Sequence, residues 1–280
     1  MAYLPIAETI YLNLIITTRE MHPGMGLRTI YELHLPRGIG RDAFMQIGAG
    51  AGLQLGRRQN AVRTTYSTKS RRYRNLLDGK TFTDVNQLWS SDITYFQAGG
   101  VTYYIAFVMD VYSRRIIGKS VETHMRAESM HAALQEAFAL RKVTDFGGQL
   151  IHHSDRGTQY ASNLYTDALD ARTVLISMCQ EVYENTHIER VNGTIKNQYL
   201  EYWIDEIRDI TTMKRYLNRA VEAYNTSRPH QSLGNISPIQ YETILPTIPP
   251  EQRTKLKIYT VKMPDTNVTN TPISQLKLEF

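Results

Sequence analysis

Apolar residues recur with two different periods along the chain, and the change of period divides it. In the N-terminal part the spacing is helical: one helix is predicted at about 5–20, an apolar-periodic segment covers 27–35, and another helix starts near Arg41. The break between them, "PRGIG" at 36–40, is a short glycine-containing turn. Helix, short turn and helix form the outline of a helix-turn-helix unit. We therefore predict a small helical DNA-binding domain over 1–56.

From about residue 84 onward the pattern becomes that of strands and then of strands alternating with helices. Strands are predicted at about 87–96, 101–110, 115–122, 149–155 and 173–178, and helices at about 126–141, 159–171, 186–204 and 211–225. This order predicts an α/β fold with a mixed five-stranded sheet and helices on its faces. We place this domain at 84–246, after a linker at 57–83 and before a poorly ordered tail at 247–280.

Charge is distributed unevenly over these regions. Residues 1–80 carry 12 Lys and Arg against 5 Asp and Glu, whereas the remainder carries 20 against 22. The segment "RRQNAVRTTYSTKSRRYR" at 57–74 has seven basic residues and no acidic one. A basic front on a near-neutral body favours nucleic acid as the partner, although a merely solvated surface would look the same. In the helical domain Arg28, Arg37 and Arg41 are the candidates for phosphate contacts.

Other features limit where the protein acts. No apolar run reaches the roughly 18 residues that suggest a membrane span, so no membrane partner is expected. The first 20 residues lack a basic region and a cleavage site, which predicts an amphipathic helix and not a signal peptide. The single cysteine, Cys179, excludes an internal disulfide and a cysteine zinc cluster and fits a reducing cytoplasm.

Two aspartates lie where a predicted strand makes charge unfavourable. Asp92 interrupts the first apolar strand, where a charge needs a partner or a metal ion. Asp155 ends "IHHSD", and binding sites form beyond the carboxyl ends of parallel strands. Taken alone, Asp155 would also fit a turn or a histidine metal site. His152 and His153, however, point to opposite faces of a strand and are more simply core residues.

A third carboxylate is predicted on the helix at 186–204. Its apolar positions form one stripe, which consists of Ile188, Val191, Ile195, Tyr199 and Tyr202. Glu189 lies at the rim of this stripe, so that a helix packed on the sheet would direct it toward the strand ends. Lys196 shares that edge and Asn192 lies between, which makes both candidates for DNA contact. Gly193 is explained equally by a closely approaching ligand or by close helix packing.

Three carboxylates without cysteine ligands favour the hard cations Mg²⁺ and Mn²⁺. Two such ions about 3.5–4 Å apart can hold the attacking and leaving oxygens of an in-line phosphoryl displacement. That chemistry agrees with a DNA-binding N-terminal domain. From the residues alone, caps, turns and ion pairs would account for the same acids.

Five motifs in a fixed order resemble those of OrfB-type bacterial insertion-sequence transposases, which carry a retroviral-integrase-like (DDE) core of the ribonuclease H-like superfamily. They are "LWSSDITYF", "FVMDVYSRRIIGKSV", "IHHSDRGTQYAS", "HIERVNGTIKNQYL" and "AYNTSRPHQSLGNISP". The resemblance implies that Asp92, Asp155 and Glu189 are the acidic triad holding two Mg²⁺, with Mn²⁺ as a substitute. It also implies that Lys196 contacts element-end DNA. The activity implied is strand cleavage at element ends and strand transfer into target DNA.

The resemblance also implies partners and a location. The partners would be terminal-repeat and target DNA, further copies of the chain on that DNA, and an upstream helix-turn-helix segment made as a separate subunit or a fusion. The protein would be cytoplasmic and nucleoid-associated in a bacterium. Two alternatives remain: a ribonuclease H-like nuclease that cleaves without joining, and a catalytically inactive DNA-binding regulator.

The position of the triad glutamate rests on the motif "ERVNGTIKN". Thirty-three residues separate Asp155 from Glu189, slightly fewer than is usual in the family. Glu181 and Glu184 are nearby, but neither lies on the motif, so Glu189 is the predicted third acid.

Several conspicuous residues are predicted to be structural. Asp110 is expected to form a turn with Ser113 and Arg114. Trp89, Trp203 and Cys179 are expected in the core. The segment "RPH" at 228–230 is predicted to reverse the chain, with DNA contact as the alternative.

Overall fold

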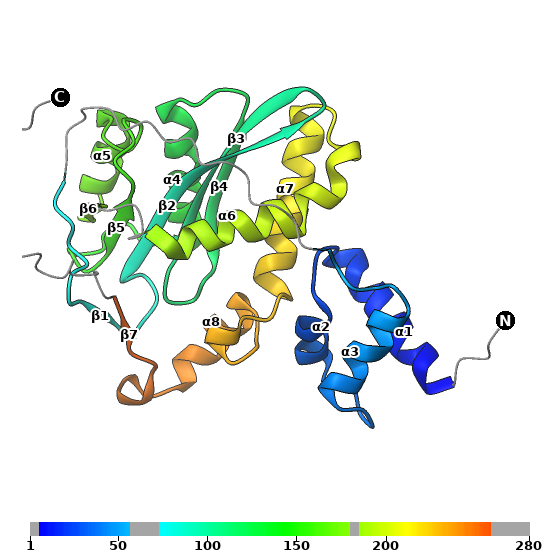
Figure 1. Cartoon of the computed structure of the whole chain (residues 1–280). Coiled ribbons are helices and arrows are strands. Elements are labelled where there is room, and N and C mark those ends of the chain that lie inside the picture. Colours follow the sequence, from blue (N-terminus) through cyan, green and yellow to red (C-terminus); the bar gives the residue numbers. More distant parts are fainter. Residues whose placement is uncertain (1–5, 57–72, 180–184, 259–280) are drawn as a thin grey trace, which may run out of the picture.

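A mixed five-stranded sheet in the order β4-β3-β2-β5-β6 forms the centre of the protein (Figure 1). The computed structural model describes residues 6–56, 73–179 and 185–258. The strands of the sheet are β2 (Leu88–Ala98), β3 (Val101–Asp110), β4 (Ile116–Glu122), β5 (Ile151–Ser154) and β6 (Leu175–Met178). The main helices around it are α4 (Ala127–Arg141), α5 (Asn163–Asp170), α6 (Thr186–Gln198), α7 (Ile210–Thr226) and α8 (Pro238–Ile244). The predicted sheet and its order of elements are confirmed.

The direction of the strands brings two distant segments to one place. β2 and β3 form an antiparallel hairpin whose turn, Gly99 and Gly100, has φ of 57° and 75°, a conformation that favours glycine. β5 runs parallel to β2, and its last paired residue, Ser154, lies opposite Ser91. The residues that follow these two serines are therefore neighbours in space.

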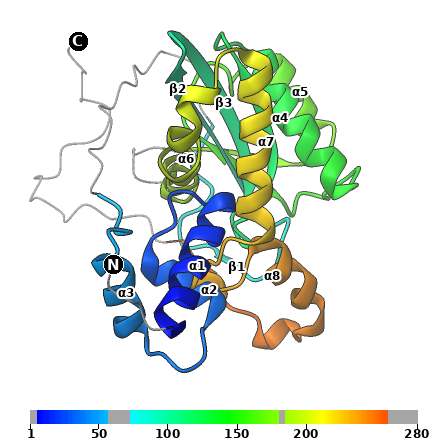
Figure 2. The same ribbon diagram turned by 90° about the vertical axis from the view of Figure 1, so that its right-hand side faces the viewer.

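Each face of the sheet is covered by its own helices (Figure 2). On one face α4 and α5 pack over a core that includes Trp89, Leu134 and Tyr165. On the other face α6 and α7 enclose a larger core with Phe107 and Trp203, which confirms both tryptophans as core residues. The strand β4 can approach α4 closely because Gly118 has no side chain: a Cβ there would lie 2.0 Å from the carbonyl oxygen of Ala133.

The helix α6 is shorter than predicted, and this changes the pattern of buried residues at its end. Four of the five predicted apolar positions are buried, namely Ile188, Val191, Ile195 and Tyr199. Tyr202 is only half-buried, whereas Leu200, which is not among the predicted apolar positions, is fully buried. The reason is that α6 ends at Gln198 and a 3₁₀ segment, Leu200–Glu206, with about 3 residues per turn follows.

The N-terminal part forms three helices around a small core of its own. They are α1 (Ile6–Met21), α2 (Leu27–His34) and α3 (Arg41–Gly50). Ile15, Ile30 and Phe44 are completely buried between them. The unit contacts the central domain through His22, whose Nδ1 is 2.8 Å from the Tyr199 hydroxyl and whose Nε2 is 3.0 Å from Ser227 Oγ.

Parts of the predicted linker and tail are ordered and pair with each other. β1 (Thr81–Phe82) and β7 (Leu256–Lys257) form a two-stranded antiparallel sheet. Leu77 and Phe82 are buried against the central core. The prediction of a poorly ordered tail is thus wrong for 247–258, where the apolar side chain of Leu256 finds a partner that the local pattern does not reveal. The basic segment 57–72 and residues 259–280 lie outside the described part of the chain.

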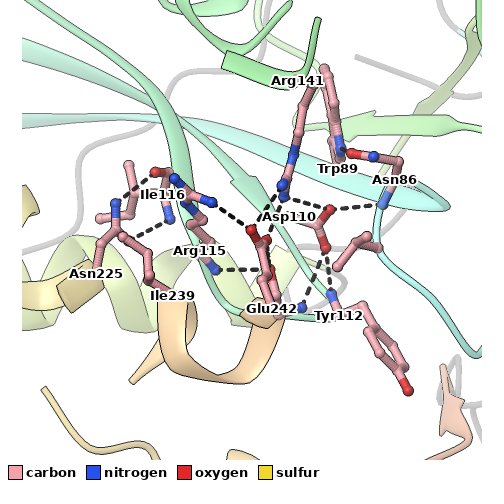
Figure 3. A network of polar contacts seen from close by, with 12 residues as sticks. Asn86, Trp89, Asp110, Tyr112, Arg115, Ile116, Arg141, Asn225, Ile239 and Glu242 are labelled. Atoms are coloured by element: carbon pink, nitrogen blue, oxygen red, sulfur yellow. Dashed lines mark hydrogen bonds and ion pairs between the residues drawn. The ribbon is translucent and has the colours of Figure 1, made fainter. Parts of the chain in front are cut away.

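A buried group of charges fixes α8 to the central domain (Figure 3). Asp110, with no exposed surface, accepts hydrogen bonds from the backbone N–H groups of Asn86, Tyr112 and Ser113 and from Arg141. Glu242 on α8 accepts from Arg141, Arg115 and Ser113. The structural role predicted for Asp110 is confirmed. None of the described helices is long and apolar enough to cross a membrane.

Candidate active site

Asp92 and Asp155 project from adjacent strands toward the face that α6 covers. Asp92 follows Ser91 in β2 and Asp155 follows Ser154 in β5, and these serines are paired in register. Asp92 Oδ2 accepts a hydrogen bond of 2.7 Å from Asn192 Nδ2 on α6. Asp155 Oδ1 accepts one of 2.9 Å from the backbone N–H of Gly157, so the turn after β5 orients it. Two carboxylates far apart in sequence thus meet beneath one helix.

The charges of these carboxylates are not neutralised by the protein. Burial and the nearby Asp155 raise the pKa of Asp92 to about 8, and Glu189 adds to the rise. Burial also raises the pKa of Asp155. Within the described residues neither aspartate forms an ion pair with a lysine or arginine. Two acids held together in a half-buried place without a cation repel each other.

Glu189 lies near this pair but does not complete a metal site in the present conformation. It is exposed in the first turn of α6 and close enough to Asp92 to raise that group's pKa. In the described ranges no three His, Cys, Asp or Glu side chains lie close enough to hold one ion. A shared site therefore requires a shift of the Glu189 side chain. Glu181 and Glu184 lie outside the described residues.

The donor atoms at this place fit a hard divalent cation. All are oxygens: the carboxylates of Asp92 and Asp155 and the buried Oδ1 of Asn192, which has no hydrogen-bond partner within the described ranges. Oxygen ligands are those that Mg²⁺ prefers, and a cation would relieve the repulsion between the two aspartates. Asp92 and Asp155 are the residues that would hold it directly.

The helix edge that faces outward from the aspartates carries Lys196 and Gly193. The Lys196 ammonium lies 5.5 Å from the centre of the Tyr95 ring. Burial lowers the pKa of Lys196, and attraction to Asp92 opposes this effect. A Cβ at Gly193 would meet no atom within 4 Å, so close helix packing does not account for this glycine. Asn192, a predicted DNA contact, is buried against Asp92, and its contact with DNA stays a prediction.

The two histidines of "IHHSD" are hydrogen-bonded core residues on opposite sides of β5. His152 Nε2 is 2.8 Å from Ser91 Oγ and 2.9 Å from the Tyr165 hydroxyl. His153 lies 2.9 Å from Ser177 Oγ and 3.1 Å from Cys179 Sγ. The prediction that they are core residues is confirmed, and Cys179 is buried as expected.

The three arginines predicted to reach phosphates are all exposed on the N-terminal unit. Arg28 forms an ion pair of 3.0 Å with Glu32, and Arg41 one of 2.9 Å with Asp42. Exposed pairs of this kind contribute about 0–1 kcal/mol and are easily exchanged for a phosphate. Their role in DNA binding stays a prediction.

Sequence reasoning missed two features beside the aspartates. The Tyr160 hydroxyl is buried without a hydrogen-bond partner in the part of the chain that the structure describes. Burial raises its pKa, and Asp155 and Asp92 raise it further. Asn185 links the start of α6 to β2, since it accepts from Ser90 Oγ and donates 3.0 Å to the carbonyl oxygen of Ser91. Their only signal in the sequence is a place at a motif end or helix start, which many polar residues share.

The central domain presents two acids from parallel strands beneath one helix, and a helical unit precedes it. This is the arrangement of an integrase-type core. A family model described as "Integrase core domain" matches residues 83–183, and a second model of that description matches 176–238. Together they extend over more than half of the chain.

Proteins encoded by bacterial insertion elements are similar in sequence to this chain. The chain is 32% identical over 234 residues to an insertion element IS600 protein of Shigella sonnei, covering 81% of this chain and 83% of that protein. It is 29% identical to the transposase for IS629 of the same species, covering 80% of this chain and 75% of the relative. The chain therefore belongs to the insertion-sequence transposases with an integrase core, which are polynucleotidyl transferases.

The fold agrees as well. A chain of the simian T-cell lymphotropic virus intasome aligns with 90% of this chain and 80% of its own length, with a TM-score of 0.51 and 18% identity. This likeness confirms the ribonuclease H-like fold that the sequence predicted.

Proposed function

We propose that Asp92, Asp155 and Glu189 form the reactive centre at which this transposase cleaves element-end DNA and joins it to target DNA. The acids would hold two Mg²⁺, with Mn²⁺ as a substitute. The observation that carries the proposal is the unneutralised pair Asp92 and Asp155, which lies where two parallel strands bring their side chains under α6. Carboxylates kept together at the expense of stability are characteristic of functional sites.

Each residue has a distinct part in the proposed reaction. Asp92 and Asp155 would hold the cations, and bound cations would supply positive charge to the reacting phosphate in an in-line displacement. Asn192 orients Asp92 through its amide, and the Gly157 N–H orients Asp155. Lys196 holds a neighbouring phosphate, and Glu189 turns inward when substrate is present. Correct placement of phosphate and nucleophile accounts for much of the rate enhancement in such reactions.

DNA binding is divided between the two parts of the protein in this proposal. The exposed Arg28, Arg37 and Arg41 bind the backbone at the N-terminal unit, while the central domain places the reacting phosphodiester. The two ends of one element require two active sites, so we infer that several copies act together on DNA, with or without an upstream subunit.

The direct test uses labelled oligonucleotides taken from the DNA flanking the gene. With Mg²⁺ or Mn²⁺, the full chain should release cleaved ends and form longer strand-transfer products. Asp155→Asn should abolish both, while the exposed matched variant Asp205→Asn should retain them. Cleavage without joining would favour a nuclease, and binding without cleavage a regulator. Products formed equally well by Asp155→Asn would refute the proposed site.

A further inference from the structure

We propose that Arg114, Arg190 and Arg228 form a second phosphate-binding site, which takes a backbone phosphate of DNA beside the N-terminal half of α6. The inference rests on the proposed function for its ligand, because a DNA transposase supplies the phosphodiester. It adds a contact point between the reactive centre and the N-terminal helical unit. The three arginines come from the turn after β3, from α6 and from the segment after α7.

The arginines converge on one group of side chains. Arg114 Nη1 donates a hydrogen bond of 2.6 Å to His187 Nδ1 in the first turn of α6. Burial lowers the pKa of Arg114, and the nearby Arg190 lowers it further. Burial also lowers the pKa of His230, and Arg228 and Arg114 add to this effect; the His230 ring packs edge-on against Tyr224 with 4.7 Å between the ring centres.

No carboxylate of the described chain forms an ion pair with any of the three arginines. Asp110 attracts Arg114, but it is already bound to Arg141. Arg228 Nε and Nη1 and His230 Nε2 are buried without a hydrogen-bond partner among the described residues. Buried donors without acceptors are unfavourable, and an anion would supply the acceptors that the two guanidinium nitrogens lack.

A phosphate oxygen suits these donors best. Guanidinium groups bind phosphate with paired, charge-assisted hydrogen bonds. His187 Nδ1 accepts the hydrogen bond from Arg114, so this ring nitrogen does not compete for the anion. The side chain of Asn185 does not cap the first turn of α6, and the backbone N–H groups of that turn add favourable dipoles.

The three arginines lie between the proposed reactive centre and the N-terminal unit. Arg190 directly follows Glu189 in α6. Ser227, which precedes Arg228, contacts His22 of the N-terminal unit. A phosphate held here would fix the path of DNA between the two parts of the protein. Such contacts position a duplex without reading its sequence.

The test measures DNA binding as a function of salt, without added metal, by fluorescence anisotropy of a labelled duplex of mixed sequence. The full-length variants are Arg114→Gln, Arg190→Gln and Arg228→Gln. The control is Arg208→Gln, an exposed arginine that loses the same charge. The slope of log K against log salt should fall by about 0.9 for each lost phosphate contact. The control should keep the slope of the unaltered protein.

Arg190→Gln protects the test against misfolding, because Arg190 is exposed and its loss leaves the core intact. Melting curves in sodium phosphate, against potassium chloride of equal ionic strength, provide the second arm. Phosphate should raise the Tm of the unaltered protein more than that of Arg228→Gln. If phosphate raises the Tm but the arginine variants keep the salt slope of DNA binding, the site takes free phosphate and not DNA. If neither the Tm difference nor the salt slope changes in the variants, the arginines have a packing role. Either outcome refutes the proposal.

Failure of this inference can be told apart from failure of the proposed function. The salt slope requires neither a cation nor cleavage, so Asp155→Asn should retain it. Reduced slopes in a protein that never cleaves DNA would leave the phosphate site intact and refute the active site. If the unaltered protein catalyses strand transfer while the arginine variants keep its salt slope, the proposed active site would stand and the phosphate site would be refuted.

Discussion

The protein contains two groups of buried or half-buried acids that it treats in opposite ways. Asp110 and Glu242 are surrounded by Arg141, Arg115 and backbone N–H groups, so their charges are balanced. Asp92 and Asp155 have the amide of Asn192 and the backbone N–H groups of Ile93 and Gly157 as partners, and the pKa of Asp92 rises to about 8 in response to burial and to Asp155. Both pairs connect segments far apart in the sequence, yet only one is electrostatically complete.

The presence or absence of ion pairs distinguishes the acids with a structural role from those that we propose to be reactive. In the balanced group the arginines hold the pKa of Glu242 below its usual value although burial opposes this, and α8 stays fixed to the core. Burial raises the pKa of Asp110, and the ion pair with Arg141 opposes that rise. In the unbalanced group the missing positive charge leaves a place for a divalent cation. In our proposal the acids that form ion pairs within the protein are structural, and the acids that it leaves without an ion pair form the reactive centre.

The largest expected effect follows removal of one unneutralised acid. Asp155→Asn should lower the rate of strand cleavage by about a thousandfold or more, equivalent to roughly 4 kcal/mol of transition-state stabilisation. The fold should remain, because the change relieves repulsion from Asp92. Single-turnover cleavage assays together with circular dichroism check both expectations. A variant that unfolds would show that Asp155 belongs to the structural class of acids.

Removal of one balancing cation should have the next largest effect, this time on stability. Arg141→Met leaves Asp110 buried without its ion pair, and breaking a buried pair costs about 3–5 kcal/mol. Denaturant unfolding measures the loss. Arg172→Met is the matched control, since Arg172 lies 4.1 Å from the centre of the Phe138 ring and contributes only about 1 kcal/mol through that contact. Equal losses in the two variants would remove the distinction between the acid groups.

The unneutralised acid should make stability depend on pH with a definite sign. In the folded protein the pKa of Asp92 is raised to about 8. The contribution of Asp92 to the free energy of unfolding is therefore fully present below about pH 4 and is lost as the pH rises through 8. Without divalent cations, Asp92→Asn should therefore stabilise the protein by about 1–3 kcal/mol at pH 9 and hardly at all at pH 4. Unfolding curves at the two pH values give the difference; the same gain at both would contradict the shifted pKa.

The smallest effect is expected at the glycine beside the reactive centre. Gly193→Ala should raise the free energy of unfolding by about 0.5–1 kcal/mol, because the added Cβ meets no atom and alanine favours a helix. If DNA passes over this edge of α6, the same variant should bind DNA more weakly. Thermal unfolding and anisotropy titration report the two changes, and unchanged DNA affinity would place the duplex elsewhere.

The sequence predicts the sheet well because its strands are long, apolar and punctuated by turns. Asp92 and Asp155 could be singled out because charge at the end of, or within, an apolar strand is unusual. Their mutual position could be inferred from parallel strands, and the structure adds the register that makes them neighbours.

Contacts between distant segments were beyond such reasoning. The pairing of β1 with β7 depends on two short strands that no local period marks. The burial of Leu200 depends on a change from α-helix to 3₁₀ geometry, for which the helical pattern gives no sign. The convergence of Arg114, Arg190 and Arg228 arises only when three separate segments fold together.

Direct binding of Mn²⁺ is the measurement that tests the central claim most closely. Free Mn²⁺ is followed by electron paramagnetic resonance at pH 9, where Asp92 is ionised, as the full chain is added. The unaltered protein and Asp205→Asn should bind the ion, and Asp92→Asn and Asp155→Asn should bind it at least about tenfold more weakly, a loss of roughly 1.4 kcal/mol or more. Binding by Asp155→Asn as tight as that of the unaltered protein would contradict the account.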